Sequence, residues 1–122
     1  MHRPAHHPVG LWEIGTPNAR ALGEFYAQLF GWHVDTSNPG WVRVTSGARE
    51  TLDGGISQTT GQAPYVTFYV EVEDLPAYLD RAKQLGATVQ VPPTAIPGDG
   101  EFAMILDPGG HRVGLLHART RP

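Results

Sequence analysis

Glu13 is the residue whose type and position most clearly indicate chemistry. It interrupts the otherwise apolar segment VGLWEI, which reads as a β-strand. Burying a carboxylate is costly unless a partner bonds it or the protein uses it, and a carboxyl group in an apolar site is suited to proton transfer. The alternative is that Glu13 lies near a strand end and is hydrated, or is paired with Arg43 or Arg112. Both interpretations stay open.

Tyr69 is the second candidate for chemistry, because its phenol could donate a hydrogen bond to a developing oxyanion or a bound carbonyl. The alternative is a tyrosine that packs its ring and hydrates its hydroxyl group. Trp41, Phe102 and Met104 could provide apolar contacts to a planar ligand, although we expect at least one of them to belong to the core.

The elements that must position these residues occur twice along the chain. VGLWEI, the turn GTPN and the helical pattern ARALGEFYAQLFGW form the first copy, and YVTFYVEV, EDLP and AYLDRAKQLGATV form the second. Gly31 and Gly86 end the two helices at equivalent positions. Short β-type segments follow each glycine, so the sequence predicts one α+β domain over 1–122, made of two βαβββ modules at about 8–60 and 64–118.

The alternation of side chains along the strands predicts which face each residue occupies. In YVTFYVEV, the four apolar residues at alternate positions should lie under the helices, and the other four should point the opposite way. The first set is Val66, Phe68, Val70 and Val72, and the second is Tyr65, Thr67, Tyr69 and Glu71. The same alternation in the first strand places Leu11 and Glu13 on the face away from the helix.

This second face mixes aromatic, hydroxyl, charged and aliphatic side chains, which is typical of the lining of a concave ligand site. A dimer interface or an ordinary exposed sheet face remains the alternative. The residues predicted to contact a ligand are Leu11, Trp41, Arg43, Thr67, Phe102, Met104, Arg112 and Gly114. Glu13 and Tyr69 are the predicted catalytic residues if the site performs a reaction.

Three segments resemble one protein family: WEIGTPNARALGEFYAQLFGW, FYVEVEDLPAYLDRAKQLGATV and FAMILDPGGHRVGLL. Each is similar to the corresponding segment of the vicinal oxygen chelate superfamily, which includes glyoxalase I, extradiol dioxygenases and bleomycin-binding proteins. The match extends from Val9 to His117. The resemblance implies paired βαβββ modules that form a curved mixed sheet around a cavity, and commonly a homodimer.

The resemblance also implies positions for a divalent metal, which the family holds through His and Glu side chains. Counted from the two helix ends, these positions fall on Leu11, Thr67, Gly114 and the pair Gly54–Gly55. None of these side chains binds a metal well, and a shift of one residue brings in a single carboxylate. We therefore expect no metal and no other cofactor.

Composition excludes several further classes. The chain has no cysteine, so disulfides, thiolate metal sites and thiol nucleophiles are absent. A net charge of −3 with scattered basic residues gives no reason to expect a nucleic-acid partner, and no segment is long and apolar enough to span a membrane. We expect a cytoplasmic protein.

Two classes of function remain, and both place a small molecule in the cavity. The first is a metal-independent protein that binds or sequesters a small cyclic or aromatic metabolite or an antibiotic. The second is a metal-free isomerase, cyclase or lyase in which Glu13 and Tyr69 exchange protons with the substrate. The fold alone does not distinguish them, because one fold can host many functions.

Overall fold

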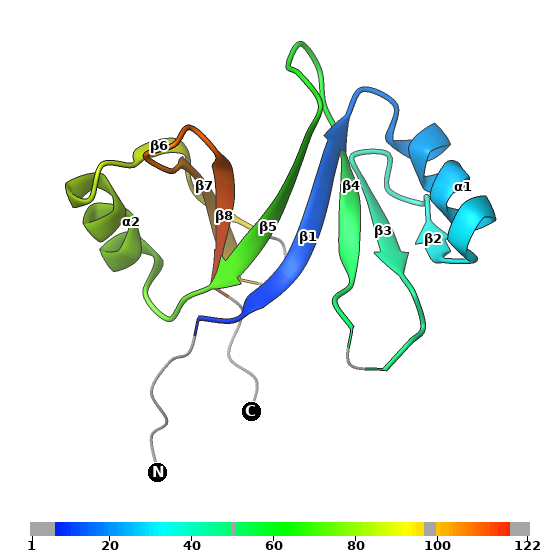
Figure 1. Ribbon diagram of the computed structural model, residues 1–122, viewed down its shortest axis with the longest axis horizontal. Helices are drawn as coiled ribbons and strands as arrows, with labels where there is room; N and C mark the ends of the chain where they lie inside the picture. The colour runs from blue at the N-terminus through cyan, green and yellow to red at the C-terminus, as the bar shows by residue number, and fades with distance from the viewer. Residues whose placement is uncertain (1–6, 50, 97–99, 118–122) are drawn as a thin grey trace. The chain divides into compact units, whose positions relative to one another are not determined.

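The computed structural model describes residues 7–49, 51–96 and 100–117 (Figure 1). Its elements run in the order β1 (Val9–Thr16), α1 (Ala19–Phe30), β2 (His33–Asp35), β3 (Trp41–Thr45), β4 (Gly54–Gln58), β5 (Tyr65–Glu71), α2 (Leu75–Gln84), β6 (Thr88–Ala95), β7 (Glu101–Leu106) and β8 (Arg112–His117). The strands form a mixed sheet of eight with the order β2-β3-β4-β1-β5-β8-β7-β6. This confirms the predicted α+β class and the two βαβββ repeats. The ligand cavity stays a prediction.

The chain packs as two compact units. One consists of Gly10–Phe68, and the other consists of Met1–Val9 together with Tyr69–Pro122. Each unit contains one helix and its own hydrophobic cluster.

In the unit Gly10–Phe68, β1 runs parallel to β4, and β3 is antiparallel to both β2 and β4. Helix α1 begins where the Asn18 side chain accepts a hydrogen bond from the Ala21 N–H. It ends at Gly31, whose φ of 72° lies in the left-handed region that glycine adopts without strain. The helix covers a core of Ala19, Val42, Val44 and Ile56.

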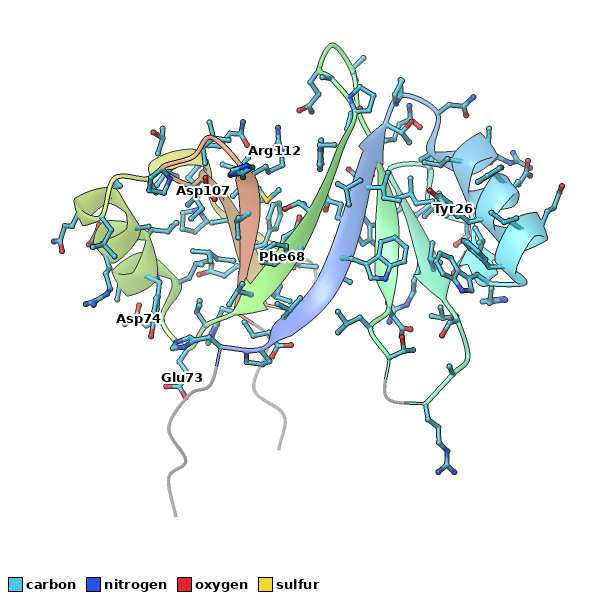
Figure 2. The ribbon with its side chains drawn as sticks, viewed as in Figure 1. Tyr26, Phe68, Glu73, Asp74, Asp107 and Arg112 are labelled. Carbon is cyan, nitrogen blue, oxygen red and sulfur yellow. The ribbon has the colours of Figure 1, made fainter. Side chains whose placement is uncertain are left out.

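In the second unit, β5 runs parallel to β8, and β7 is antiparallel to both β6 and β8. The Asp74 side chain caps α2 by accepting a hydrogen bond from the Ala77 N–H (Figure 2). The core under α2 contains Val72, Leu75, Leu79, Ala103, Ile105 and Leu115. The two units thus repeat one arrangement, in which a capped helix covers one face of a four-stranded segment.

The predicted positions of Val66 and Phe68 are wrong. Their exposed fractions are 76% and 42%, whereas Val70 and Val72 pack with the core of α2 as expected. The reason is the reach of the helices, since among the described residues α1 contacts β2, β3 and β4, and α2 contacts β6, β7 and β8. Alternation therefore separated the side chains of β5 as predicted, but neither helix covers Val66 and Phe68.

The two helices of the described residues are short. The longer, α1, has 12 residues, and neither is long and apolar enough to cross a membrane.

Candidate ligand-binding site

Strand register aligns the predicted site residues of the unit Gly10–Phe68 in one row across the sheet. Glu13 in β1 pairs with Gly55 in β4, and Gly55 pairs with Arg43 in β3. Arg43 in turn pairs with Asp35 in β2. Because the residues flanking Arg43 pack in the core under α1, this row lies on the face of the sheet away from the helix.

The second unit contains the equivalent row. Tyr69 in β5 pairs with Gly114 in β8, and Gly114 pairs with Met104 in β7. Each strand occupies the same place in its own repeat, so Tyr69 corresponds to Glu13 and Met104 to Arg43. The sequence analysis therefore selected the same face of both repeats.

Glu13 is buried, with only 4% of its surface exposed. The hydroxyl group of Tyr65 donates a hydrogen bond to its carboxylate. The Tyr65 ring reaches this position because Gly15 leaves space for it, and a Cβ atom on Gly15 would lie 2.1 Å from Cε2 of the ring. The hydrogen bond between Glu13 and Tyr65 thus depends on the absence of a side chain at Gly15, which lies two residues after Glu13 in β1.

Trp41 lies on the other side of Glu13. Its indole ring covers Gly55, where a Cβ atom would be 1.9 Å from Cζ2 of the ring. Gly55 is the register partner of Glu13. The Trp41 ring thus covers the residue opposite Glu13, and the Tyr65 ring covers Gly15. Both rings are half-buried, and the arrangement presents a carboxylate between two aromatic surfaces.

The row contains two acidic residues, Glu13 and Asp35, and one basic residue, Arg43. The exposed Arg43 lies opposite Asp35 in the sheet. The backbone N–H of Ser37 lowers the pKa of the Asp35 carboxyl below its ordinary value, with a smaller contribution from the charge of Arg43. Asp35 and Arg43 are exposed, whereas Glu13 is buried.

The corresponding face of the second unit is more apolar. Tyr69 is 6% exposed and Met104 is 3% exposed. The Tyr69 ring covers Gly114 and meets the Phe102 ring edge-on, with 6.2 Å between the centroids. Met104 is a core side chain, as was expected for at least one of the predicted apolar contacts.

The remaining predicted site residues lie in β1, β5 and β8. Leu11 is half-buried, and Thr67 is 5% exposed with its hydroxyl directed to the carbonyl oxygen of Phe68. Arg112 is half-buried at the start of β8, beside the turn that contains Asp107 (Figure 2). Glu13 and Tyr69, the predicted catalytic residues, belong to different units.

The partner of Glu13 that the sequence analysis missed is Tyr65. Alternation along β5 placed Tyr65 on the correct face, but gave no reason to connect it with Glu13. The signal was Gly15, which has no side chain on that face two residues after Glu13 and so leaves space for a ring.

The residues at the metal positions of the family do not form a ligand set. These positions are Leu11, Thr67, Gly114 and the pair Gly54–Gly55, of which Thr67 alone has a polar side chain, and its hydroxyl is directed to the carbonyl oxygen of Phe68. Within residues 7–49, 51–96 and 100–117, no three His, Cys, Asp or Glu side chains lie close enough to hold a metal ion. These side chains do not fit a protein-held divalent cation, and we derive no step through one.

The fold consists of two βαβββ repeats, and each repeat has a glycine, Gly55 or Gly114, at the equivalent position of its sheet. These features define a class of small α+β proteins. Residues 13–116 match the family of the glyoxalase-like domain, and the chain belongs to that family.

Curated relatives include proteins of mycobacteria and streptomycetes. CFP32 of Mycobacterium tuberculosis (strain CDC 1551 / Oshkosh), whose name marks it as a candidate glyoxylase, is 32% identical over 116 residues, which cover 87% of this chain and 44% of CFP32. The anthracycline biosynthesis protein DnrV of Streptomyces peucetius is 27% identical over 128 residues, which cover 90% of this chain and 46% of DnrV. The chain thus spans about half the length of these relatives.

Solved structures support the fold. The methylmalonyl-CoA epimerase of Mycobacterium tuberculosis has a TM-score of 0.62 at 15% identity, and the match covers 98% of this chain and 95% of the epimerase. The Mn(II)-bound glyoxalase of Novosphingobium aromaticivorans has a TM-score of 0.65 at 15% identity, covering 93% of this chain and 40% of the glyoxalase. At such identities the similarity concerns the fold alone.

Proposed function

We propose that this glyoxalase-like protein binds a planar aromatic small molecule that carries a cationic group, without a metal ion. The ligand contacts the face of the unit Gly10–Phe68 that lies away from α1. The observation that supports this proposal is the buried Glu13 carboxylate, held by the Tyr65 hydroxyl between the rings of Tyr65 and Trp41.

The carboxylate accounts for the cationic group. A ligand ammonium group can donate a further charge-assisted hydrogen bond to this buried carboxylate. A carboxylate accepts several hydrogen bonds at once, so the ligand can join the Tyr65 hydroxyl. The faces of Trp41 and Tyr65 also favour a nearby cation.

The aromatic rings account for the planar part of the ligand. Rings such as those of Trp41 and Tyr65 stack well on flat aromatic molecules. The relative DnrV is named for anthracycline biosynthesis. Anthracyclines are planar fused-ring aromatics, and daunorubicin carries an amino sugar that is cationic at neutral pH, so this class combines both features that the site recognises.

A metal-free reaction is the alternative function, and the hydrogen bond between Glu13 and Tyr65 is the observation that favours it. A carboxylate joined to a phenol can accept a proton from a substrate and return it elsewhere. We favour binding, because the described side chains already explain recognition without requiring a bond to break.

Titration with two related probes tests the proposal. Daunorubicin carries the ammonium group, whereas its aglycone daunorubicinone retains the rings and lacks the amino sugar. The native protein should bind daunorubicin about 10- to 100-fold more tightly, the equivalent of a charge-assisted hydrogen bond of about 1.5–3 kcal/mol. The Glu13→Gln variant should bind both probes with similar affinity.

Glu24→Gln provides the matched control, because Glu24 lies exposed on α1 and pairs with Arg20. This variant should keep the native preference for daunorubicin. Equal affinity of the native protein for both probes, or no binding of either, would overturn the proposal. Mass analysis of the probe after incubation separates the two functions, since formation of a product that Glu13→Gln abolishes would favour the metal-free reaction.

A further inference from the structure

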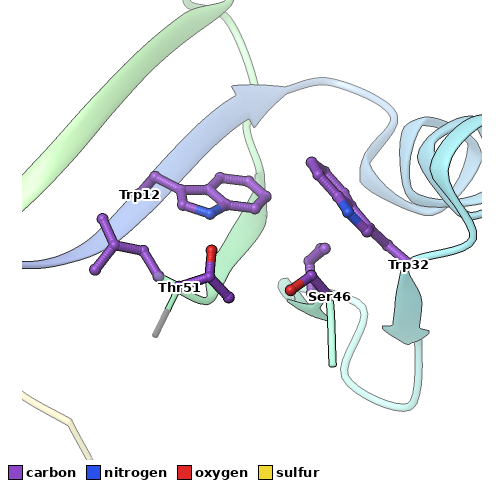
Figure 3. Close-up of a pocket in the computed structure, with 6 residues that line it drawn as sticks. Trp12, Trp32, Ser46 and Thr51 are labelled. Carbon is purple, nitrogen blue, oxygen red and sulfur yellow. The ribbon is translucent and has the colours of Figure 1, made fainter. Parts of the chain in front are cut away.

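A pocket lies on the opposite face of the same unit, on the side of the sheet that α1 covers. It has a volume of about 230 Å³ and opens beside two indole rings (Figure 3). Its lining residues come from β1, the connection between α1 and β2, β3 and the segment between β3 and β4: Trp12, Trp32, Val44, Ser46, Thr51 and Leu52. Because Trp12 neighbours Glu13 in β1, their side chains point to opposite faces of the sheet.

The aromatic walls of this pocket are held in place by their neighbours. The Trp12 ring covers Gly54, where a Cβ atom would lie 2.1 Å from its Cδ2. The Trp32 ring stacks on Tyr26 with 5.7 Å between centroids and packs against Phe30 at 4.9 Å. The Trp12 and Trp32 rings are 5.8 Å apart and inclined by 40°, so they form a preformed wedge.

The polar groups of the pocket are neutral hydroxyls. The Ser46 Oγ accepts a hydrogen bond of 3.1 Å from the Ala48 N–H, which leaves its own proton available to donate. Thr51 contributes an exposed hydroxyl group at the rim. None of the six lining residues is charged, so the lining offers nothing to compensate an ionic ligand.

From these features we propose that the pocket formed by Trp12 and Trp32 is a second small-molecule site, which takes a neutral ring compound bearing a hydrogen-bond acceptor. An apolar cavity of about 150 Å³ holds one benzene ring, so a pocket of about 230 Å³ accommodates a bicyclic compound. The ring lies against the two indoles, and the acceptor receives the Ser46 hydroxyl proton. This site does not depend on the proposed function of Glu13, because its lining residues face the other way.

The indole N–H signals of the three tryptophans provide a direct test. The probe is coumarin, a neutral bicyclic lactone with a carbonyl acceptor, added to ¹⁵N-labelled protein. The signals of Trp12 and Trp32 should shift and saturate as coumarin is added. Trp41 lies on the opposite face, and its signal should stay in place.

Substitution at Ser46 provides the second part of the test. Ser46→Leu fills the pocket from a half-buried position outside any strand or helix, and should weaken coumarin binding by at least about tenfold. Ser37→Leu makes the same change at an exposed position outside the pocket and should bind as the native protein does. A native position of the Trp41 indole signal and a native urea midpoint show that the fold is retained in both variants.

Three results would overturn the inference. The first is the absence of any shift of the Trp12 and Trp32 signals at millimolar coumarin. The second is a shift of Trp41 that matches theirs, which would place the probe elsewhere. The third is native affinity in Ser46→Leu. None of these results bears on daunorubicin binding at Glu13, so the two sites succeed or fail separately.

Discussion

Replacing Tyr65 by Phe removes the hydroxyl that donates to the buried Glu13 carboxylate while keeping the ring over Gly15. Hydrogen bonds to charged groups contribute about 1.5–3 kcal/mol, and a buried acceptor that loses its donor also loses the compensation for its desolvation. We therefore expect the Tyr65→Phe substitution to lower the free energy of unfolding by about 2 kcal/mol. Glu13→Gln should cost less, because an amide oxygen still accepts the hydrogen bond.

Urea unfolding, followed by the fluorescence of the three tryptophans, measures this free energy. Tyr26→Phe is the matched control, since the structure shows no hydrogen bond of the Tyr26 hydroxyl within the described residues and its ring stacks on Trp32. This control should change the free energy of unfolding by less than about 0.5 kcal/mol. If Tyr65→Phe were no more destabilising than Tyr26→Phe, the inferred role of the Tyr65 hydroxyl would be wrong.

Four further outcomes follow from the structure. Gly55→Ala places a Cβ atom 1.9 Å from the Trp41 ring, so it should lower the free energy of unfolding by about 1–3 kcal/mol in urea and alter tryptophan fluorescence. Asp74→Ala removes the cap of α2 and should cost about 1 kcal/mol, measured in the same way. The His111 backbone N–H holds the pKa of Asp107 below its ordinary value of 3.8, so the carboxylate stabilises the fold above that pH. This contribution is lost as the pH falls through the lowered pKa, and Asp107→Asn should reduce the acid-induced drop in the urea midpoint. Sedimentation equilibrium should give a homodimer of twice 13.2 kDa, and a mass near 13.2 kDa would contradict that expectation.

Helix boundaries and repeat register were accessible from the sequence because they depend on local chemistry. The helical patterns predicted that Gly31 and Gly86 end the two helices, and Gly31 does end α1 in the left-handed conformation. Counting from these two glycines placed Leu11 and Thr67 at equivalent positions of the two repeats, and the strand pairing agrees with that alignment. Local signals of this kind need no knowledge of tertiary contacts.

The details of the site depend on contacts between residues far apart in the chain. Alternation gave the facing of Val66 and Phe68 but not the reach of the helices, which left both side chains exposed. Gly15 and Gly55 indicated space for a ring, but the sequence did not show which aromatic residue would cover each glycine, since these contacts form only when β1, β3 and β5 are arranged in the sheet. Tyr65 was missed for that reason.

The most direct test of the central claim is a crystal structure of the protein with daunorubicin bound. The account predicts that the fused rings lie against Trp41 and Tyr65, with the ammonium group within hydrogen-bond distance of the Glu13 carboxylate. A structure in which the protein's own side chains fill this face, or in which the ligand lies away from Glu13, would contradict it.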